Sequence, residues 1–156
     1  MTEIKIEMIE GPIGDEGVPE AWGSGSFGAI LTFRGVVRGR NHGRSVKAVF
    51  YEAFEPLARS VLDAICREAL LKFRVDDGKM YIAHSTGEIL PGQASLVVAV
   101  ATIHRAEGFG AAQYAIDELK RRVPIWKLEH YSDGTSAWLR GCALPGHTQA
   151  TGGEHG

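Results

Sequence analysis

Cysteine is scarce in this sequence, and its two copies, Cys66 and Cys142, are too few for a disulfide framework. They also lack the paired spacing of a zinc site, so we expect Cys66 to be a small buried residue and Cys142 to be incidental. Such sparing use of cysteine suits a reducing compartment. A chain of 156 residues can bury roughly two thirds of its unfolded surface, which lets one domain fold without disulfides or metal.

Long apolar runs and an excess of basic charge are also absent from the sequence. No run reaches the length of a membrane span. The first ten residues carry acidic side chains and no secretory apolar stretch, so the predicted location is the cytoplasm. A formal net charge of −2 argues against a nucleic-acid-binding module, but it leaves room for a small basic pocket.

Apolar residues recur at strand or helix spacing along most of the chain. They predict strands over 4–9, 27–37, 46–54, 80–90, 95–103 and 125–131. Two helices are predicted, one from Pro56 and one over 106–122, with core stripes of Leu57, Val61, Ile65 and Ala69 and of Phe109, Ala112, Ile116 and Leu119. We therefore expect an α+β (mixed α/β) fold: one domain over 1–144, with a mainly antiparallel sheet and two main helices packed on it. The small polar residues of 145–156 predict a disordered tail.

A glycine motif and a lone histidine have structural rather than chemical interpretations. Gly23, Gly25 and Gly28 spell G-x-G-x-x-G, but a predicted loop precedes them and a strand follows, which is the reverse of a dinucleotide site. We interpret them as a flexible entry to a strand. His84 lies inside a predicted strand and is expected to be a core or strand-end residue rather than a ligand. No metal-site motif is present, and no cofactor or metal is expected.

His104 and Arg105 are two polar residues that end a long apolar run where the second helix begins. Free backbone N–H groups and the helix dipole make such a position receptive to anions, and an arginine adds a forked donor for phosphate. The alternative is an ordinary solvated strand end, and position alone does not separate the two.

Lysines near the end of the second helix are candidates for chemistry. Lys120 borders the predicted buried face of the helix. Lys127 follows Trp126 on a predicted strand, so the side chains of Trp126 and Lys127 point to opposite sides. A lysine partly enclosed by apolar groups and near other cations loses proton affinity, and it can then act as acid, base or nucleophile. For Arg121 and Arg122 we prefer a structural interpretation, because basic residues complement the dipole at a helix C-terminus.

The polar loop at 38–45 carries three arginines. Each alone would be an ordinary solvated charge. Taken together with the candidates above, they predict one cationic pocket that suits an anionic small substrate or a carboxylate-bearing tail. The pocket would be lined by Arg38, Arg40, Arg44, His104, Arg105, Lys120 and Lys127.

Two long stretches of the sequence resemble the large subunit of molybdopterin synthase. They are TFRGVVRGRNHGRSVKAVFYEAF at 32–54 and GEILPGQASLVVAVATIHRAEGFGAAQYAIDELKRRVPIWKLEHYSDGTSAW at 87–138. The most specific pieces are H-R followed by F, D-x-L-K, P-I-W-K-x-E and D-G…W, in the family's order and spacing. The resemblance covers about residues 3–140. Ser85, Leu57 and Leu128 depart from residues common in the family, and none of these departures removes a candidate catalytic group.

The resemblance implies a sulfurtransferase subunit that converts cyclic pyranopterin monophosphate to molybdopterin. Sulfur would come from the thiocarboxylated C-terminus of a small ubiquitin-like subunit, and the large subunit would form a homodimer. By motif position, Lys120 and Lys127 match the family's catalytic pair. Arg38, His104 and Arg105 match residues that contact the substrate, and the neighbouring Val36, Val37, Leu128 and Glu129 are expected to line the pocket.

Two other functions fit the residues less well. The chain could be a non-catalytic dimeric scaffold that binds a small-protein Gly-Gly tail, but a scaffold would not need both lysines together with Arg38 and the His104–Arg105 pair. It could also be an unrelated anion-binding protein, which would bind phosphate tightly and have no affinity for such a tail.

Overall fold

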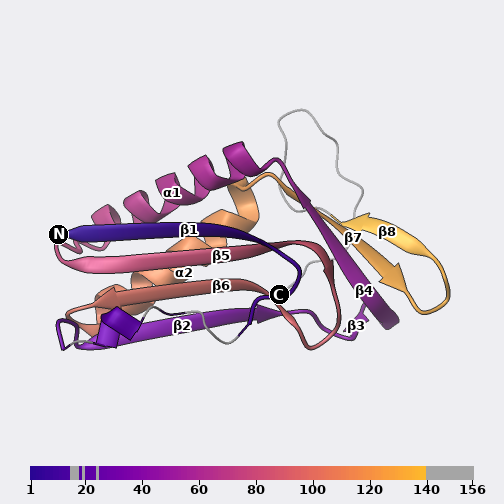
Figure 1. The fold of residues 1–156 in the computed structure, drawn as a ribbon, viewed down its shortest axis with the longest axis horizontal. Helices are drawn as coiled ribbons and strands as arrows, with labels where there is room; N and C mark the ends of the chain where they lie inside the picture. Colours follow the sequence, from indigo (N-terminus) through magenta and orange to yellow (C-terminus); the bar gives the residue numbers. More distant parts are fainter. Residues whose placement is uncertain (15–17, 19, 24, 140–156) are drawn as a thin grey trace.

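The computed structural model describes residues 1–14, 18, 20–23 and 25–139. Within them, an eight-stranded sheet and two long helices form one α+β domain, as predicted (Figure 1). The strands are β1 (Thr2–Glu10), β2 (Ala29–Val36), β3 (Arg40–Asn41), β4 (Arg44–Ala53), β5 (Gly78–Ile89), β6 (Ala94–Thr102), β7 (Ile125–Tyr131) and β8 (Ser136–Leu139). The helices are the 3₁₀ helix η1 (Glu20–Gly23), α1 (Glu55–Lys72) and α2 (Arg105–Arg122). Cys142 and the predicted tail at 145–156 lie outside the described residues.

The sheet branches along β5. Its main path runs β2–β6–β5–β4–β7–β8, with antiparallel pairing throughout. One edge of β5 pairs with β1, in parallel, as far as Thr86, and with β4 from Gly87 onward. Gly87 has a φ of +81°, which glycine adopts at little cost, so the strand can change partner there. The β4–β7–β8 unit therefore leaves the main sheet at an angle (Figure 1).

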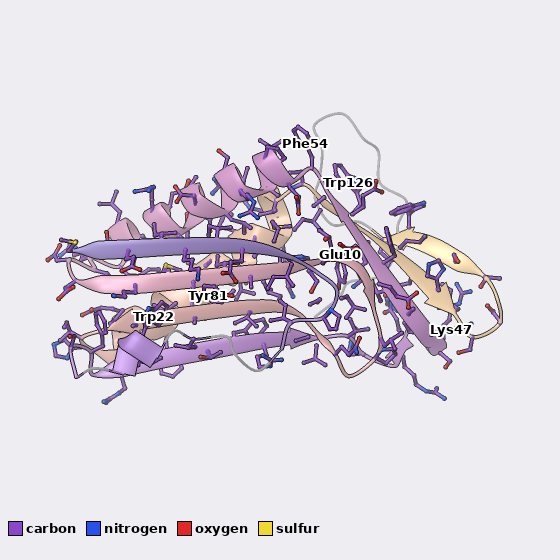
Figure 2. All side chains as sticks on the ribbon, in the orientation of Figure 1. Glu10, Trp22, Lys47, Phe54, Tyr81 and Trp126 are labelled. Atoms are coloured by element: carbon purple, nitrogen blue, oxygen red, sulfur yellow. The ribbon has the colours of Figure 1, made fainter. Side chains whose placement is uncertain are left out.

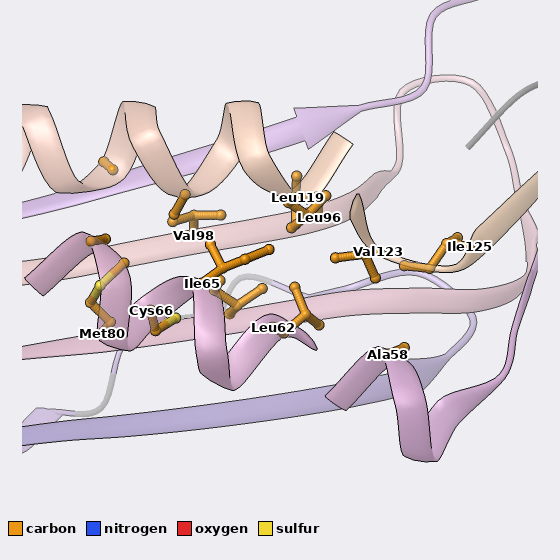
Figure 3. Packing of buried hydrophobic residues seen from close by; sticks show 14 of the residues in the cluster. Ala58, Leu62, Ile65, Cys66, Met80, Leu96, Val98, Leu119, Val123 and Ile125 are labelled. Carbon is orange, nitrogen blue, oxygen red and sulfur yellow. The ribbon is translucent and has the colours of Figure 1, made fainter. Parts of the chain in front are cut away.

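Both long helices pack on one face of the main sheet. Pro56 stands in the first turn of α1, where its missing N–H is no loss, and α2 ends at Arg122, with Val123 as its C-cap just before Pro124. Leu62 and Ile65 of α1 are fully buried, and Figure 3 shows them in the layer between helix and sheet. Truncation of either to alanine would cost about 2–5 kcal/mol, because the lost contacts leave a cavity.

The segment after β1 covers part of the opposite face of the sheet. Trp22 of η1 is buried and packs in one apolar cluster with Tyr81 of β5 and Val97 of β6. Figure 2 shows Trp22 over the strands on the side away from the long helices. This cover explains why every residue of β6 is buried, as its continuous apolar sequence predicted.

The predicted helix stripes are partly wrong. Leu57 is 46% exposed and Phe109 is 62% exposed. In α1 the buried line begins one residue later, at Ala58, whose small side chain lets the helix approach the sheet. In α2 it passes through Gly108 instead of Phe109. A Cβ on Gly108 would lie 2.7 Å from Leu31 Cδ1, so this turn sits too close to β2 for a large side chain.

Two short strands were not predicted, and the glycine motif has a packing role. β3 lies inside the predicted polar loop, and β8 follows the turn at Asp133 and Gly134. Gly28 leads into β2, where an added Cβ would lie 2.4 Å from the carbonyl oxygen of Ile103. The glycine therefore permits close contact of two backbones at the entry to a strand, which agrees with a structural interpretation of G-x-G-x-x-G.

Candidate active site

The candidate site is built on the inner face of β7. Successive side chains of a strand point to opposite sides, so Lys127, Glu129 and Tyr131 share one face, and Trp126 and Leu128 share the other. The register with β4 places Tyr51 opposite Lys127 and Val49 opposite Glu129. Trp126 and Lys127 therefore point to opposite sides of the strand, as predicted. Lys127 points to the side where Tyr51 and Val49 are buried.

Lys127 is surrounded by other charges. Its side chain is 24% exposed, and its Nζ lies 3.9 Å from Glu129 Oε1. Burial lowers the pKa of the Lys127 ammonium; the Glu129 carboxylate partly opposes this change, and the charges of Lys120 and Arg38 lower the pKa further. The structure thus brings together Lys120, Lys127 and Arg38, three of the residues that the sequence predicted to share a pocket.

The end of α2 is what sets the two lysines close to each other. Lys120 lies in the last turn of the helix, and Val123 caps that turn by donating its N–H to the Leu119 carbonyl oxygen at 3.1 Å. Pro124 disfavours a further helical turn, so the chain enters β7 at once. Only Val123 and Pro124 separate the helix from the strand, so Lys120 and Lys127 lie on either side of a short connection.

Glu129 is 3% exposed, and other residues of the site surround its carboxylate. Asn41 Nδ2 donates to it and lies 3.1 Å from each of the two carboxylate oxygens. The Tyr131 hydroxyl also donates to Glu129; the pKa of Tyr131 is raised first by burial and then by this bond. These contacts supply the partners that a buried carboxylate requires.

His84 and Tyr51 lie beneath Lys127. Their rings meet edge to face, with centroids 5.3 Å apart. His84 Nδ1 lies 2.8 Å from the Ser85 carbonyl oxygen, and burial lowers the His84 pKa to about 4, an effect to which Lys127 adds. His84 is thus the buried strand histidine that the sequence predicted, and its uncharged ring lies near the charged Lys127.

The His104–Arg105 pair does not reach this pocket within one chain. His104 caps the start of α2 and Arg105 is its first residue, whereas Lys120 lies in the last turn. At 1.5 Å of rise per residue, Arg105 and Lys120 are separated by about 22 Å along the helix. Figure 1 shows the start of α2 at the opposite end of the sheet from β7. The prediction that one chain gathers all these residues in one pocket is therefore wrong.

The remaining predicted residues lie in different surroundings. Val37 is buried and Val36 is half exposed at the end of β2, next to Arg38. Leu128 lies on the outer face of β7, opposite Phe50 of β4 and Trp138 of β8, so it does not line the pocket with Lys127. In the chain as described, its side chain belongs to an apolar row on the surface.

The other basic residues near the site mostly have structural partners. Arg44 stacks on Tyr131, with 3.6 Å between the guanidinium carbon and the ring centroid, and it also bonds Thr135. Arg122 holds Glu68 of α1 through two bonds, of 2.6 and 3.0 Å. Arg121 pairs with Glu118. For Arg121 and Arg122, these contacts agree with the structural interpretation preferred from the sequence.

Grouped metal ligands and exposed thiols are absent from the described part of the chain. There, no three His, Cys, Asp or Glu side chains are grouped as metal ligands would be. Burial raises the pKa of the Cys66 thiol to about 12, so Cys66 is an inert packing residue, as expected. None of the described helices is long and apolar enough to cross a membrane.

Sequence reasoning missed residues that organise the pocket. Asn41, Tyr51 and Tyr131 contact or adjoin the charged side chains, yet they lie far apart in the chain. Part of the signal was present: Lys127, Glu129 and Tyr131 alternate along a predicted strand, which puts them on one face. Asn41 gave no such signal, because its bond to Glu129 spans 88 residues.

The chain resembles known proteins along most of its length. The family model described as MoaE protein matches residues 11–122. The molybdopterin synthase catalytic subunit of Synechococcus elongatus is 41% identical over 140 residues, which cover 90% of this chain and 84% of that protein. The molybdopterin synthase structure from Staphylococcus aureus has a TM-score of 0.74 and 31% identity, covering 85% of this chain and 95% of its own. A complex of subunits 1 and 2 of the molybdopterin-converting factor from Helicobacter pylori shares the fold, with a TM-score of 0.68 and 21% identity over 82% of this chain and 86% of its own.

Proposed function

The chain belongs to the MoaE family of molybdopterin synthase catalytic subunits, enzymes of molybdenum cofactor biosynthesis, and we propose that its Lys120–Lys127–Arg38 pocket transfers sulfur to a pterin phosphate. The observation that carries the proposal is the half-enclosed Lys127, whose pKa is lowered by burial and by two neighbouring cations. A lowered pKa makes the Lys127 ammonium a better proton donor, which suits a group that moves protons during catalysis.

The proposed substrate is cyclic pyranopterin monophosphate. Its phosphate is an anion, and Arg38 can offer a forked donor while the lysines offer point charges. Arg38 follows Val37, whose backbone is bonded to the β5–β6 turn at both its N–H and its carbonyl oxygen. A fixed backbone at Val37 favours a defined position for the arginine that follows it.

The proposed sulfur donor is the thiocarboxylated C-terminal tail of a small ubiquitin-like subunit. The thiocarboxylate sulfur forms a carbon–sulfur bond with a carbon of the pterin side chain, and the bond from that carbon to its oxygen breaks. One of the two displaced oxygens stays on the phosphate as the cyclic phosphate opens, and the other leaves as water. Water then attacks the tail carbonyl, the bond between that carbonyl and sulfur breaks, and a carboxylate remains on the small subunit. Two such transfers give the dithiolene, with Lys120 and Lys127 as the groups that move protons during opening of the cyclic phosphate and sulfur attack.

We further propose that the active form is a homodimer in which a partner copy supplies the His104–Arg105 pair. One chain holds this pair about 22 Å along α2 from Lys120, so the family's motif set is incomplete at a single pocket. A surface for self-association is available on the outer face of the β4–β7–β8 unit. Phe50, Leu128 and Trp138 are paired across its three strands, and Phe50 and Trp138 are 40% and 59% exposed.

The test is a reconstitution with this chain, a thiocarboxylated small subunit and cyclic pyranopterin monophosphate, with molybdopterin as the product measured. Lys120→Ala and Lys127→Ala are each expected to lower the rate at least about a hundredfold, the usual contribution of an acid–base group. Lys47→Ala is the matched control, since Lys47 is an exposed lysine on β4 that does not face the pocket (Figure 2).

Folding and partner binding are measured on the same variants. Full activity in both lysine variants would show that the catalytic assignment is wrong. A stable complex of the native chain with the small subunit, but without product, would favour the scaffold function. Tight phosphate binding with no affinity for the Gly-Gly tail would favour an unrelated anion-binding protein.

A further inference from the structure

The loop that carries Arg38 is held at both ends by contacts inside the molecule. On one side, the Val37 N–H donates to the Gln93 carbonyl oxygen at 3.0 Å, and the Gly92 N–H donates to the Val37 carbonyl oxygen at 2.8 Å. On the other side, Asn41 is 8% exposed and bonds the Glu129 carboxylate. Arg38 therefore lies in a span of three residues between two fixed points.

The bond between Asn41 and Glu129 can have only one polarity. A carboxylate accepts and cannot donate, so the NH₂ side of the Asn41 amide must face Glu129 and not its oxygen. Lys127 lies 3.9 Å from the same carboxylate, which is beyond a direct hydrogen bond. Asn41 and Tyr131 thus satisfy the buried charge, and Lys127 does not have to fold down onto it.

We propose that Asn41 is a positioning residue of the active site: by bonding Glu129 it fixes the 38–45 loop, and Arg38 within it, and leaves Lys127 free to face the substrate. In its catalytic consequence this inference rests on the proposed function. It also gives Glu129 a more specific task than lining the pocket, as the sequence predicted, because a carboxylate that is 3% exposed and already bonded acts through Asn41 and Lys127.

A second contact supports the same arrangement. Arg44, at the other side of the β3–β4 turn, stacks on Tyr131 and pairs with Asp133 at 3.6 Å. Tyr131 is also the residue that donates to Glu129. Asn41 and Arg44 therefore attach both arms of one short hairpin to β7, and Asn41 is the attachment that shares a carboxylate with Lys127.

The test uses Asn41→Asp, which keeps the shape of the side chain but removes the donor and sets a second carboxylate against Glu129. The first readout is hydrogen exchange of the amides in 39–46, where the Val46 N–H donates to the Gly39 carbonyl oxygen. Loss of a hydrogen bond to a buried charge is expected to speed exchange there at least about tenfold, with β6 unchanged. The second readout is the KM for cyclic pyranopterin monophosphate, which is expected to rise at least about tenfold, since Arg38 loses its fixed position.

Restoring the pair with its groups exchanged provides the control that a general loss of stability would not pass. Asn41→Asp combined with Glu129→Gln again sets one amide against one carboxylate, and slow exchange of 39–46 is expected to return. Lys47→Ala, on the neighbouring strand β4 but outside the contact, is expected to leave exchange and KM unchanged. If Asn41→Asp does not fold, Asn41→Ala is compared instead, because it removes the donor without adding charge.

The outcomes separate this inference from the proposed function. A native protein that forms no molybdopterin would overturn the proposed function. Exchange of 39–46 that is the same in native protein and in Asn41→Asp would overturn the positioning role of Asn41, whatever the activity. Fast exchange that persists in the exchanged pair, in a protein that otherwise folds, would overturn it as well.

Discussion

His84 makes the stability of the protein depend on pH in a direction that the structure fixes. The residue is 6% exposed, its ring packs edge to face on Tyr51, and one of its nitrogens is bonded to the Ser85 carbonyl oxygen. Burial lowers the His84 pKa from 6.5 to about 4, and the charge of Lys127 acts in the same direction. Protonation would therefore place a second cation beneath Lys127 in a site with little water.

The sign and size of the effect follow from linkage between protonation and folding. The unfolded chain binds a proton at His84 below about pH 6.5, and the folded chain does so only below about pH 4. The stabilisation is therefore complete above pH 6.5 and is lost as pH falls toward 4. The full difference corresponds to about 3 kcal/mol, of which about 2 kcal/mol is lost by pH 5, before most carboxylates titrate.

The assay is urea unfolding at about pH 7.5 and about pH 5, on native protein and on His84→Gln. The native protein is expected to lose about 2 kcal/mol more than the variant between these conditions, because the glutamine cannot take up the proton. His130→Gln is the control; it removes a histidine that is less buried, and it should keep the native loss. An equal loss in native protein and in His84→Gln would refute the idea that a neutral buried His84 sets the acid limit.

Two further predictions concern surfaces and packing. Trp138→Glu is expected to turn the proposed dimer into a monomer in sedimentation velocity. Leu71→Glu, at an exposed apolar residue outside the β4–β7–β8 unit, should leave the dimer intact. A dimer in both variants would place the interface elsewhere. Gly28→Ala is expected to lower the free energy of unfolding by about 1–3 kcal/mol, because its Cβ would lie 2.4 Å from the Ile103 carbonyl oxygen. Gly23→Ala, where no atom lies within 4 Å, should have little effect, and equal losses would refute the packing argument.

Local sequence signals predicted the elements but not how they are oriented. Period and proline placement located α1, α2 and the longer strands, since these signals lie within a few residues of each other. The face that each helix buries was harder to predict, because close approach favours small residues. Gly108 is buried and Phe109 is exposed because the helix lies against Leu31 at that turn, and hydrophobicity alone ranks them in the opposite order.

The candidate site divides in the same way. Lys120 and Lys127 were predictable, because they lie only a few residues apart in the sequence, on either side of a helix end and a proline. The bond that satisfies Glu129 was not, because Asn41 belongs to a two-residue strand inside a polar loop. A buried carboxylate must have donors, but the sequence does not say which distant residue provides them.

The position of His104–Arg105 shows how a motif can be intact in sequence and still be divided in space. The order H-R, then D-x-L-K, then P-I-W-K suggests one pocket, but the first two pieces occupy opposite ends of an 18-residue helix. A straight helix cannot bring its ends together. If the pair serves the same reaction as the lysines, a second copy of the chain has to provide it, so dimerisation would be a requirement of the chemistry. The apolar row of Phe50, Leu128 and Trp138 crosses β4, β7 and β8, and the opposite face of β7 carries Lys127, so one strand would connect the proposed interface with the pocket.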